Sequence, residues 1–217
     1  MKTLPLLLTV SVLFSAVLPS RGADASKLTN DEIKAGFKPL FNGIDRTGWK
    51  LRRAEGHDSW SIEPGGVLKN TVNAGEHGTD LVTDEKFWNF TVRYEYLVPD
   101  GSNSGFYLRG RHELQILGDY KRGKPDLHGD ASIYGVQAPS EYASKPGGEW
   151  NTVEATIIGH KITVILNGKK VHDNVECNVA TGSEIDKNLD QPGPIFLQGD
   201  HGTVSFRNVR IKTLPKE

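Results

Sequence analysis

The chain has 217 residues, of which 26 are Lys or Arg and 27 are Asp or Glu, so its formal net charge is −1. A protein that binds a nucleic-acid backbone needs a surplus of positive charge, and the absence of one argues against nucleic acid as a partner. The 24 Gly and 11 Pro residues favour a turn-rich protein with many strands over a helical bundle.

The first 25 residues have the pattern of a signal peptide. Lys2 supplies an early positive charge, a run rich in Leu and Val follows as far as Leu18, and small residues surround Gly22 and Ala25. The apolar run is short for a membrane span, so we expect cleavage between residues 22 and 25 and no membrane attachment afterwards. The prediction is therefore an exported protein, either periplasmic or extracellular.

The remaining chain, residues 26–217, shows no repeat, linker or low-complexity segment and is predicted to form one domain. Cys177 is its one cysteine, so an internal disulfide is excluded. A capping box predicts a short helix at its start: Thr29 is followed three residues later by Glu32, and Gly36 provides a stop signal.

Beyond the helix, apolar residues recur with a period of two, which predicts strands. In chain order they are Phe90, Val92, Tyr94 and Tyr96; Phe106 and Leu108; Leu114 and Ile116; Val153, Ala155 and Ile157; Ile195 and Leu197; and Val204 and Phe206. Asn167-Gly168 between two such runs predicts a tight hairpin. The pattern predicts an all-β protein, a single antiparallel sandwich or barrel.

Several polar residues that alternate with these strands carry chemical functions. They are Glu95, Tyr107, Arg109, Glu113, Gln115 and Gln198. If the apolar residues face the core, these side chains share the opposite face of the sheet. Two carboxylates, an arginine, a tyrosine and two amides suggest the floor of a polar binding cleft. An ordinary solvated face crossed by ion pairs is the alternative.

Short motifs run through nearly the whole domain, from about residue 38 to 213. In order they are Phe41-Asn42-Gly43, Gly48-Trp49, Asp80-Leu81, Asn103-Ser104-Gly105-Phe106-Tyr107-Leu108-Arg109, Glu113-Leu114-Gln115-Ile116-Leu117, Gly148-Glu149-Trp150-Asn151, Leu166-Asn167-Gly168, a segment from Ile195 to Gly202, and a segment from Phe206 to Ile211. This series resembles the 3-keto-disaccharide hydrolase domain family. The resemblance implies a concanavalin-like or laminin G-like jelly roll, in agreement with the alternation.

The chain departs from the family pattern at one point. Two residues, Gly199 and Asp200, separate Gln198 from His201, where many members have one. A small bulge would absorb the extra residue.

The resemblance implies cleavage of glycosides that carry a ketone at C3 of the sugar. The ketone acidifies the hydrogen at C2, so that a base can remove it, the C1 substituent leaves by elimination, and water adds back. This chemistry needs a base, a group that stabilises the enolate oxygen, and an acid for the leaving group. We assign the base to Glu113 or His201 and the charge stabilisation to Arg109. Glu95 is the second carboxylate, either the acid or the orienting partner of Arg109.

The predicted substrate is a small carbohydrate, with contacts from amides and aromatic rings. The candidate contacts are Asn103, Tyr107, Gln115, Tyr134, Trp150 and Gln198. Trp150 is equally well explained as a core residue, and a turn explains Asp80 nearly as well as function does. An ion pair with Arg109 that joins two strands is the structural alternative for Glu113. The sequence indicates no oligomeric state.

A divalent cation is a further candidate. His128, Asp130 and Asp200 would converge with Glu113, and oxygen-rich ligation suits Ca²⁺ or Mn²⁺. No spacing typical of zinc is present, and no other cofactor is implied.

Two other functions remain open at this stage. A conventional glycoside hydrolase uses two carboxylates, but Gln115 stands where the second acid would be expected. A non-catalytic carbohydrate-binding module is the third interpretation, because a fold alone does not establish activity.

Overall fold

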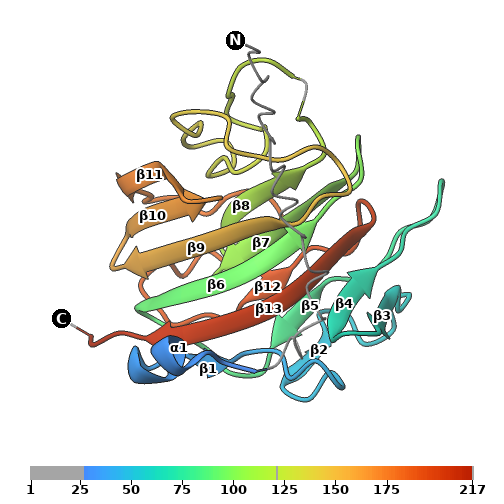
Figure 1. Cartoon of the computed structure of the whole chain (residues 1–217), viewed down its shortest axis with the longest axis horizontal. Coiled ribbons are helices and arrows are strands. Elements are labelled where there is room, and N and C mark those ends of the chain that lie inside the picture. The colour runs from blue at the N-terminus through green and yellow to red at the C-terminus, as the bar shows by residue number, and fades with distance from the viewer. Residues whose placement is uncertain (1–26, 121, 217) are drawn as a thin grey trace, which may run out of the picture.

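The segments with alternating apolar residues form two antiparallel β-sheets that pack face to face (Figure 1). The computed structural model describes residues 27–120 and 122–216, and the predicted signal peptide lies outside these ranges. Within them, no helix has the length and hydrophobicity needed to cross a bilayer. The expected all-β sandwich with one short N-terminal helix is confirmed.

The larger sheet has eight strands among the described residues. They are β1 (Lys38–Pro39), β3 (Trp60–Glu63), β4 (Val67–Asn70), β6 (Phe90–Leu97), β9 (Asn151–Ile158), β10 (Lys161–Leu166), β11 (Lys169–Glu176) and β13 (Val204–Thr213). Their order is β11-β10-β9-β6-β13-β4-β3, with β1 paired to β13. Thus β13 occupies the middle of the sheet, between strands that lie far earlier in the sequence.

The smaller sheet has five strands. They are β2 (Trp49–Leu51), β5 (Leu81–Thr83), β7 (Asn103–Leu108), β8 (His112–Leu117) and β12 (Phe196–Leu197), in the order β2-β5-β12-β7-β8. Aromatic rings join the two sheets across the core: Tyr94 of β6 stacks on Phe106 of β7 with ring centroids 3.9 Å apart, and both side chains are buried.

The helix and the hairpin predicted from short sequence motifs are both present in the structure. Helix α1 (Asn30–Lys34) begins at the predicted capping box, in which the Glu32 N–H donates to Thr29 Oγ1. Asn167 and Gly168 both have positive φ, at 50° and 81°, as a two-residue hairpin between β10 and β11 requires.

Strands β7 and β8 differ from a simple sandwich because they are buried on both faces. Segments 130–134 and 181–185 cover the outer face of this pair: the Ala131 N–H donates to the Gln115 carbonyl, and the Tyr107 hydroxyl donates to the Gly182 carbonyl. The outer face of the smaller sheet is therefore roofed, and a polar cavity lies beneath the roof.

Candidate active site

A cavity of about 110 Å³ opens on the outer face of the five-stranded sheet. Phe106 and Leu114 of this sheet face the core. Tyr107 and Phe196 form a separate apolar cluster on the opposite face of the sheet, where the cavity lies. The cavity is lined by Asn103, Tyr107, Glu113, Tyr134, Gly182, Ser183, Gln198 and His201. Six of these eight residues are candidates from the sequence, and the structure brings them together. Gly182 and Ser183 are the other two.

Glu113 is held at the floor of the cavity by the register of two strands. It lies on β8 opposite Tyr107 of β7. Its N–H donates to Thr181 Oγ1 at 2.8 Å, and its carbonyl accepts from the Tyr134 N–H at 3.1 Å. Its carboxylate lies over Gly105, where an added Cβ would approach Oε1 to 2.4 Å. Only glycine at that position leaves room for the carboxylate.

The same burial changes the acidity of this carboxyl group. Glu113 is only 4% exposed, and loss of hydration raises its pKa to about 7. The Tyr107 hydroxyl and the charge of His201 oppose the increase, whereas Asp200 and Asp80 add to it. A carboxyl group with a pKa near neutrality is suited to accept a proton and to release it again.

Burial of Glu113 also makes the stability of the fold depend on pH. Because the folded-state pKa of about 7 is above the ordinary value of 4.5, the folded protein binds this proton more tightly than the unfolded chain does. This contribution is fully present below pH 4.5 and is lost as the pH rises through 7. The loss amounts to on the order of 3 kcal/mol in the free energy of unfolding.

Glu113→Gln should remove this loss of stability at high pH, because the amide side chain does not ionise. We expect Glu113→Gln to unfold roughly 5–10 °C above the wild type at about pH 8.5, and the two melting temperatures to converge near pH 5. Thermal unfolding followed by circular dichroism across this range measures the effect. Glu95→Gln, which changes a glutamate that does not line the cavity, is the matched control. Parallel curves for Glu113→Gln and wild type would contradict the buried, weakly acidic carboxyl group.

Two amide side chains in the cavity have unpaired oxygens. Asn103 Oδ1 and Gln198 Oε1 are buried and have no hydrogen-bond partner in the structure. Gln198 is placed there by the pairing of β12 with β7, and its N–H donates to the Gly105 carbonyl at 2.9 Å. An unpaired buried oxygen costs about 1–3 kcal/mol, so a ligand hydroxyl that donates to it is favoured. These two amide oxygens are therefore suited to accept hydrogen bonds from the hydroxyls of a sugar.

The Gly199-Asp200 turn before His201, which contains the extra residue, is held in a defined conformation. The Gly199 N–H donates to Asp80 Oδ1 at 2.9 Å, and Asn70 Nδ2 donates to the carbonyls of Gly199 and Gly202 at 2.9 and 2.7 Å. The turn carries His201 to the cavity wall. There, His201 Nδ1 lies 2.5 Å from Asp200 Oδ1, which leaves Nε2 as the ring nitrogen for a ligand.

Arg52 fixes the roof of the cavity, and the sequence analysis missed it. Its Nη1 and Nη2 donate to the carbonyls of Ser183 and Glu184 at 2.8 and 2.9 Å, and Nη1 lies 3.3 Å from Asp80 Oδ2. Asp80 therefore holds both the roof, through Arg52, and the His201 turn, through Gly199. Burial raises the pKa of the Asp80 carboxyl group.

The placement predicted for Arg109 is wrong. Arg109 follows the last residue of β7 with φ of 54°, so the strand alternation ends before it. Its guanidinium packs 3.7 Å above the ring of Trp88 and donates to the carbonyls of Trp88 and Gly159, each at 2.7 Å. Burial lowers its pKa to about 10. Arg109 is a buried structural residue outside the cavity.

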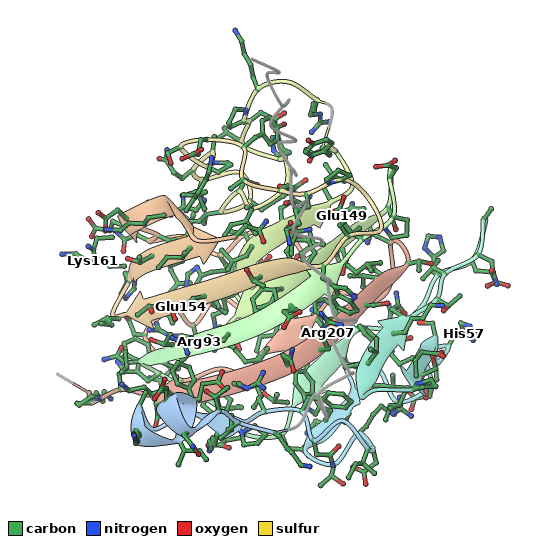
Figure 2. All side chains as sticks on the ribbon, in the orientation of Figure 1. His57, Arg93, Glu149, Glu154, Lys161 and Arg207 are labelled. Atoms are coloured by element: carbon green, nitrogen blue, oxygen red, sulfur yellow. The ribbon has the colours of Figure 1, made fainter. Side chains whose placement is uncertain are left out.

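Glu95 and Trp150 are also outside the cavity, because Glu95 belongs to the other sheet and Trp150 directly precedes β9 of that sheet. Glu95 is on β6 of the eight-stranded sheet, and its Oε2 accepts from Arg207 Nη2 at 2.7 Å. The same guanidinium lies 4.0 Å above the Trp150 ring. Figure 2 shows Arg207 along this sheet with Arg93 and Glu154. The expectation that Glu95 and Glu113 share one sheet face is therefore wrong.

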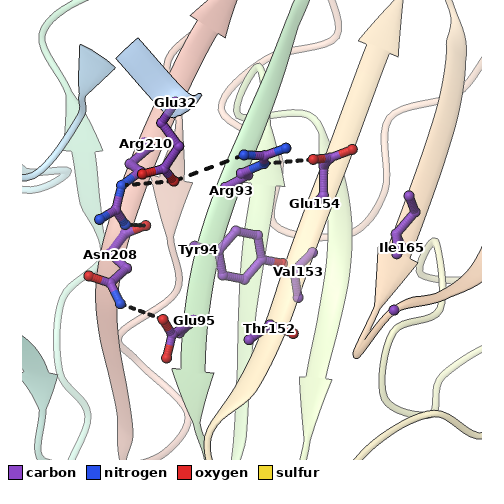
Figure 3. Close-up of a pocket in the computed structure, with 11 residues that line it drawn as sticks. Glu32, Arg93, Tyr94, Glu95, Thr152, Val153, Glu154, Ile165, Asn208 and Arg210 are labelled. Atoms are coloured by element: carbon purple, nitrogen blue, oxygen red, sulfur yellow. Dashed lines mark hydrogen bonds and ion pairs between the residues drawn. The ribbon is translucent and has the colours of Figure 1, made fainter. Parts of the chain in front are cut away.

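A shallow hollow of about 220 Å³ lies beside Glu95 on the eight-stranded sheet (Figure 3). Its charged groups are engaged with one another: Arg93 Nε lies 2.6 Å from Glu154 Oε2, and Arg210 Nε lies 3.2 Å from Glu32 Oε1. The Arg210–Glu32 pair attaches helix α1 to the sheet, and the Arg93–Glu154 pair joins β6 to β9, so both pairs have a structural role.

Gln115, His128 and Asp130 join β8 to the loop that covers it. Gln115 Nε2 donates to the His128 carbonyl at 3.3 Å, and Gln115 does not line the cavity. Asp130 is buried and accepts from the Tyr96 hydroxyl at 2.5 Å and from the Leu117 N–H at 2.9 Å. Burial raises its pKa to about 6.

The metal candidates do not converge. His128 is exposed, and Asp200 is paired with His201. In residues 27–120 and 122–216, no three His, Cys, Asp or Glu side chains are arranged to hold a metal ion. His128, Asp130 and Asp200 therefore do not form the Ca²⁺ or Mn²⁺ site that the sequence suggested.

Comparison with known proteins decides the family. The sequence profile of the 3-keto-alpha-glucoside-1,2-lyase-like domain matches residues 36–212. The chain belongs to this family. The family resemblance inferred from the motifs is thereby confirmed.

Relatives of this lyase-like domain include characterised and crystallised proteins. The chain is 29% identical to the 3-keto-disaccharide hydrolase of Bacteroides thetaiotaomicron, over 94% of this chain and 87% of the relative. It is similar to a crystallised candidate glycosyl hydrolase from Parabacteroides distasonis with a TM-score of 0.71 and 25% identity, over 88% of this chain and 99% of that chain. A second candidate glycosyl hydrolase from that organism matches with a TM-score of 0.64 and 28% identity, over 81% and 82% of the two chains.

Three of the motifs shared with the lyase-like family meet at the cavity. The first contributes Asn103 and Tyr107, the second contributes Glu113, and the third contributes Gln198 and His201. The segment around residues 181–184, which forms the roof, carries no such motif. The hydrogen bonds that hold it go to the carbonyls of Gly182 and Ser183, which any residue type would provide, so the sequence does not mark it as part of the site.

Proposed function

We propose that this protein cleaves 3-keto-glycosides by removing the proton at C2, eliminating the substituent at C1 and adding water to the product. The name of the Bacteroides relative supports a 3-keto-disaccharide as the substrate class. One observation carries the mechanism. Glu113 is the one carboxylate that the structure places in the lining of the cavity, and its pKa is close to neutrality.

Glu113 is the base in this mechanism. A ketone at C3 makes the C2 hydrogen acidic, and the ionised Glu113 takes that proton. As the C–H bond breaks, its electron pair forms the C1=C2 double bond, through an enolate, and the C1–O bond breaks. The pKa of about 7 leaves a substantial fraction of Glu113 ionised at neutral pH while keeping it a stronger base than an exposed glutamate.

His201 is the acid that protonates the leaving oxygen. Asp200 accepts from Nδ1 at 2.5 Å, which orients the ring. Nε2 then donates the proton to the C1 substituent as it departs. Water subsequently adds to C1 of the enone, and a proton returns to C2, so that the net reaction is hydrolysis.

The enolate oxygen is stabilised by amides in this proposal, since Arg109 packs on Trp88 instead. The side-chain amides of Gln198 and Asn103 line the cavity and contain both N–H donors and oxygen acceptors. A donor from one amide reaches the ketone oxygen, while the unpaired oxygens accept from the sugar hydroxyls.

The two-carboxylate hydrolase is the weaker alternative. Asp80 is engaged by Gly199 and Arg52, and it does not line the cavity. A second acid would have to come from Asp200, whose carboxylate is engaged by His201.

The decisive experiment incubates the purified protein with a 3-keto-disaccharide and, separately, with the unoxidised disaccharide. Free sugar released from the keto form alone supports the proposed function. Release from both substrates would favour the two-carboxylate hydrolase. Binding of either sugar without release would identify a carbohydrate-binding module.

We also propose that the protein is exported after removal of its first 22–25 residues. The apolar run after Lys2 and the small residues before Ala25 support this proposal. Intact-mass measurement of the protein from its natural host is the test. A mature chain that retains Met1 or Lys2 would contradict it.

A further inference from the structure

The cavity that contains Glu113 shares two of its lining residues with a larger cleft. The cavity measures about 110 Å³, which is below the roughly 300–1,000 Å³ of typical ligand sites. The adjoining cleft measures about 570 Å³, and its lining shares Asn103 and His201 with the cavity. A substrate of two sugar units therefore extends beyond the Glu113 cavity into this cleft.

Three loops at one end of the sandwich form the cleft: the loop after β4, the turn between β6 and β7, and the turn before β13 (Figure 1). Its lining residues are Val72, Asn73, Ala74, Gly75, Glu76, His77, Pro99, Gly101, Ser102, Asn103, His201, Gly202 and Thr203. Glu113 does not line it. His201 therefore borders both the cavity that contains the base and the cleft.

We propose that this cleft is the subsite for the leaving group, and that it selects a hydroxyl-rich leaving group such as a second sugar. The proposal rests on the function proposed above. His201 lines both spaces and protonates the leaving oxygen, so the C1 substituent departs past His201 into the cleft. The ketone-bearing ring occupies the cavity with Glu113.

The chemistry of the cleft wall supports a sugar. His77 uses Nδ1 for the Asp200 carbonyl at 3.2 Å, which leaves Nε2 for a ligand. Asn73 Nδ2 donates to Glu76 Oε2 at 2.9 Å, which leaves Asn73 Oδ1 and Glu76 Oε1 as acceptors. These groups complement hydroxyls. Among the described residues that line the cleft, none is a Phe, Tyr or Trp, so an aromatic leaving group has no ring to stack on.

The cleft walls are joined by hydrogen bonds. Thr203 Oγ1 accepts from the Val72 N–H at 3.1 Å, and Ser102 Oγ donates to the Thr203 carbonyl at 2.8 Å. Gly202 permits close packing, because an added Cβ would lie 2.5 Å from Ser102 Oγ and 2.8 Å from Asn103 N. These contacts form the cleft without a ligand, which lowers the cost of ordering it on binding.

The test compares two substrates in the full-length protein. One is a 3-keto-disaccharide, and the other is methyl 3-keto-glucoside, whose leaving group is too small to occupy the cleft. We expect Asn73→Ala and His77→Ala each to lower kcat/KM for the disaccharide by about 5- to 10-fold, as the loss of one hydrogen bond predicts, and to change it less than 2-fold for the methyl glycoside. His57→Ala, an exposed histidine that does not line the cleft, is the matched control and should change neither.

The outcomes separate the two proposals. Equal losses on both substrates, or no loss on either, would overturn the leaving-group subsite while leaving the proposed function intact. A wild-type protein that cleaves neither 3-keto-glycoside would instead overturn the proposed function. Inhibition by the free leaving sugar that weakens about 5-fold or more in Asn73→Ala supports the subsite independently, since the Asn73 side chain is hydrogen-bonded to Glu76 of its own loop.

Discussion

Glu113→Gln is expected to lower kcat on a 3-keto-disaccharide by roughly 10²- to 10⁴-fold, because the amide cannot accept the C2 proton. The substitution preserves the shape of the side chain over Gly105, so substrate binding and the fold should remain. Steady-state kinetics give the loss. Exchange of the C2 hydrogen in deuterated water reports the proton transfer separately from elimination, and it should fall in parallel.

The matched control is Glu95→Gln. Glu95 is a partly buried glutamate whose carboxylate is on the eight-stranded sheet, paired with Arg207. We expect its kcat to stay within about 2-fold of wild type, because it does not line the cavity. If Glu113→Gln and Glu95→Gln had equal activities, Glu113 would not be the base.

His201→Asn should produce a loss that depends on the leaving group. A sugar alkoxide leaves poorly without a proton, so we expect kcat on the disaccharide to fall by roughly 10²-fold or more. A nitrophenolate needs little protonation, so a nitrophenyl 3-keto-glucoside should lose only a few-fold. The measurement is kcat for both substrates in both proteins, with His57→Ala as the control histidine variant.

The same experiment assigns the two roles, which the sequence left open between Glu113 and His201. If His201 were the base, His201→Asn would abolish exchange of the C2 hydrogen, and Glu113→Gln would show the dependence on the leaving group. Exchange that persists in His201→Asn agrees with Glu113 as the base.

The strands and several site residues were predictable from the sequence because their signals are local. The alternation from Phe90 to Tyr96 directly gave β6, and Asn167-Gly168 gave the hairpin. The shared motifs identified Glu113 and His201, which come from distant parts of the chain.

Pairing between strands was not predictable in the same way. Strand β6 pairs with β9 and β13, from which it is separated by long stretches of chain, and no local pattern shows which sheet a strand joins. Glu95 was therefore assigned to the wrong sheet. The placement predicted for Arg109 is wrong for a different reason: its positive φ ends the strand alternation one residue earlier than its motif suggests. Arg52 donates to backbone carbonyls in the roof. Because every residue type has a carbonyl, the sequence does not show where these contacts form.

The central position of β13 has a consequence for how the chain acquires its structure. Val204–Thr213 fills the gap between β6 and β4. Each of those strands therefore lacks its neighbour on that side until the ribosome has synthesised the chain to about residue 213. Because these contacts join distant segments, folding should be slow and should follow synthesis of nearly the whole polypeptide. Slow folding suits the export proposed above, because a chain must be unfolded to pass through a narrow translocation channel. The open edges of β6 and β4 would need protection from aggregation during that interval.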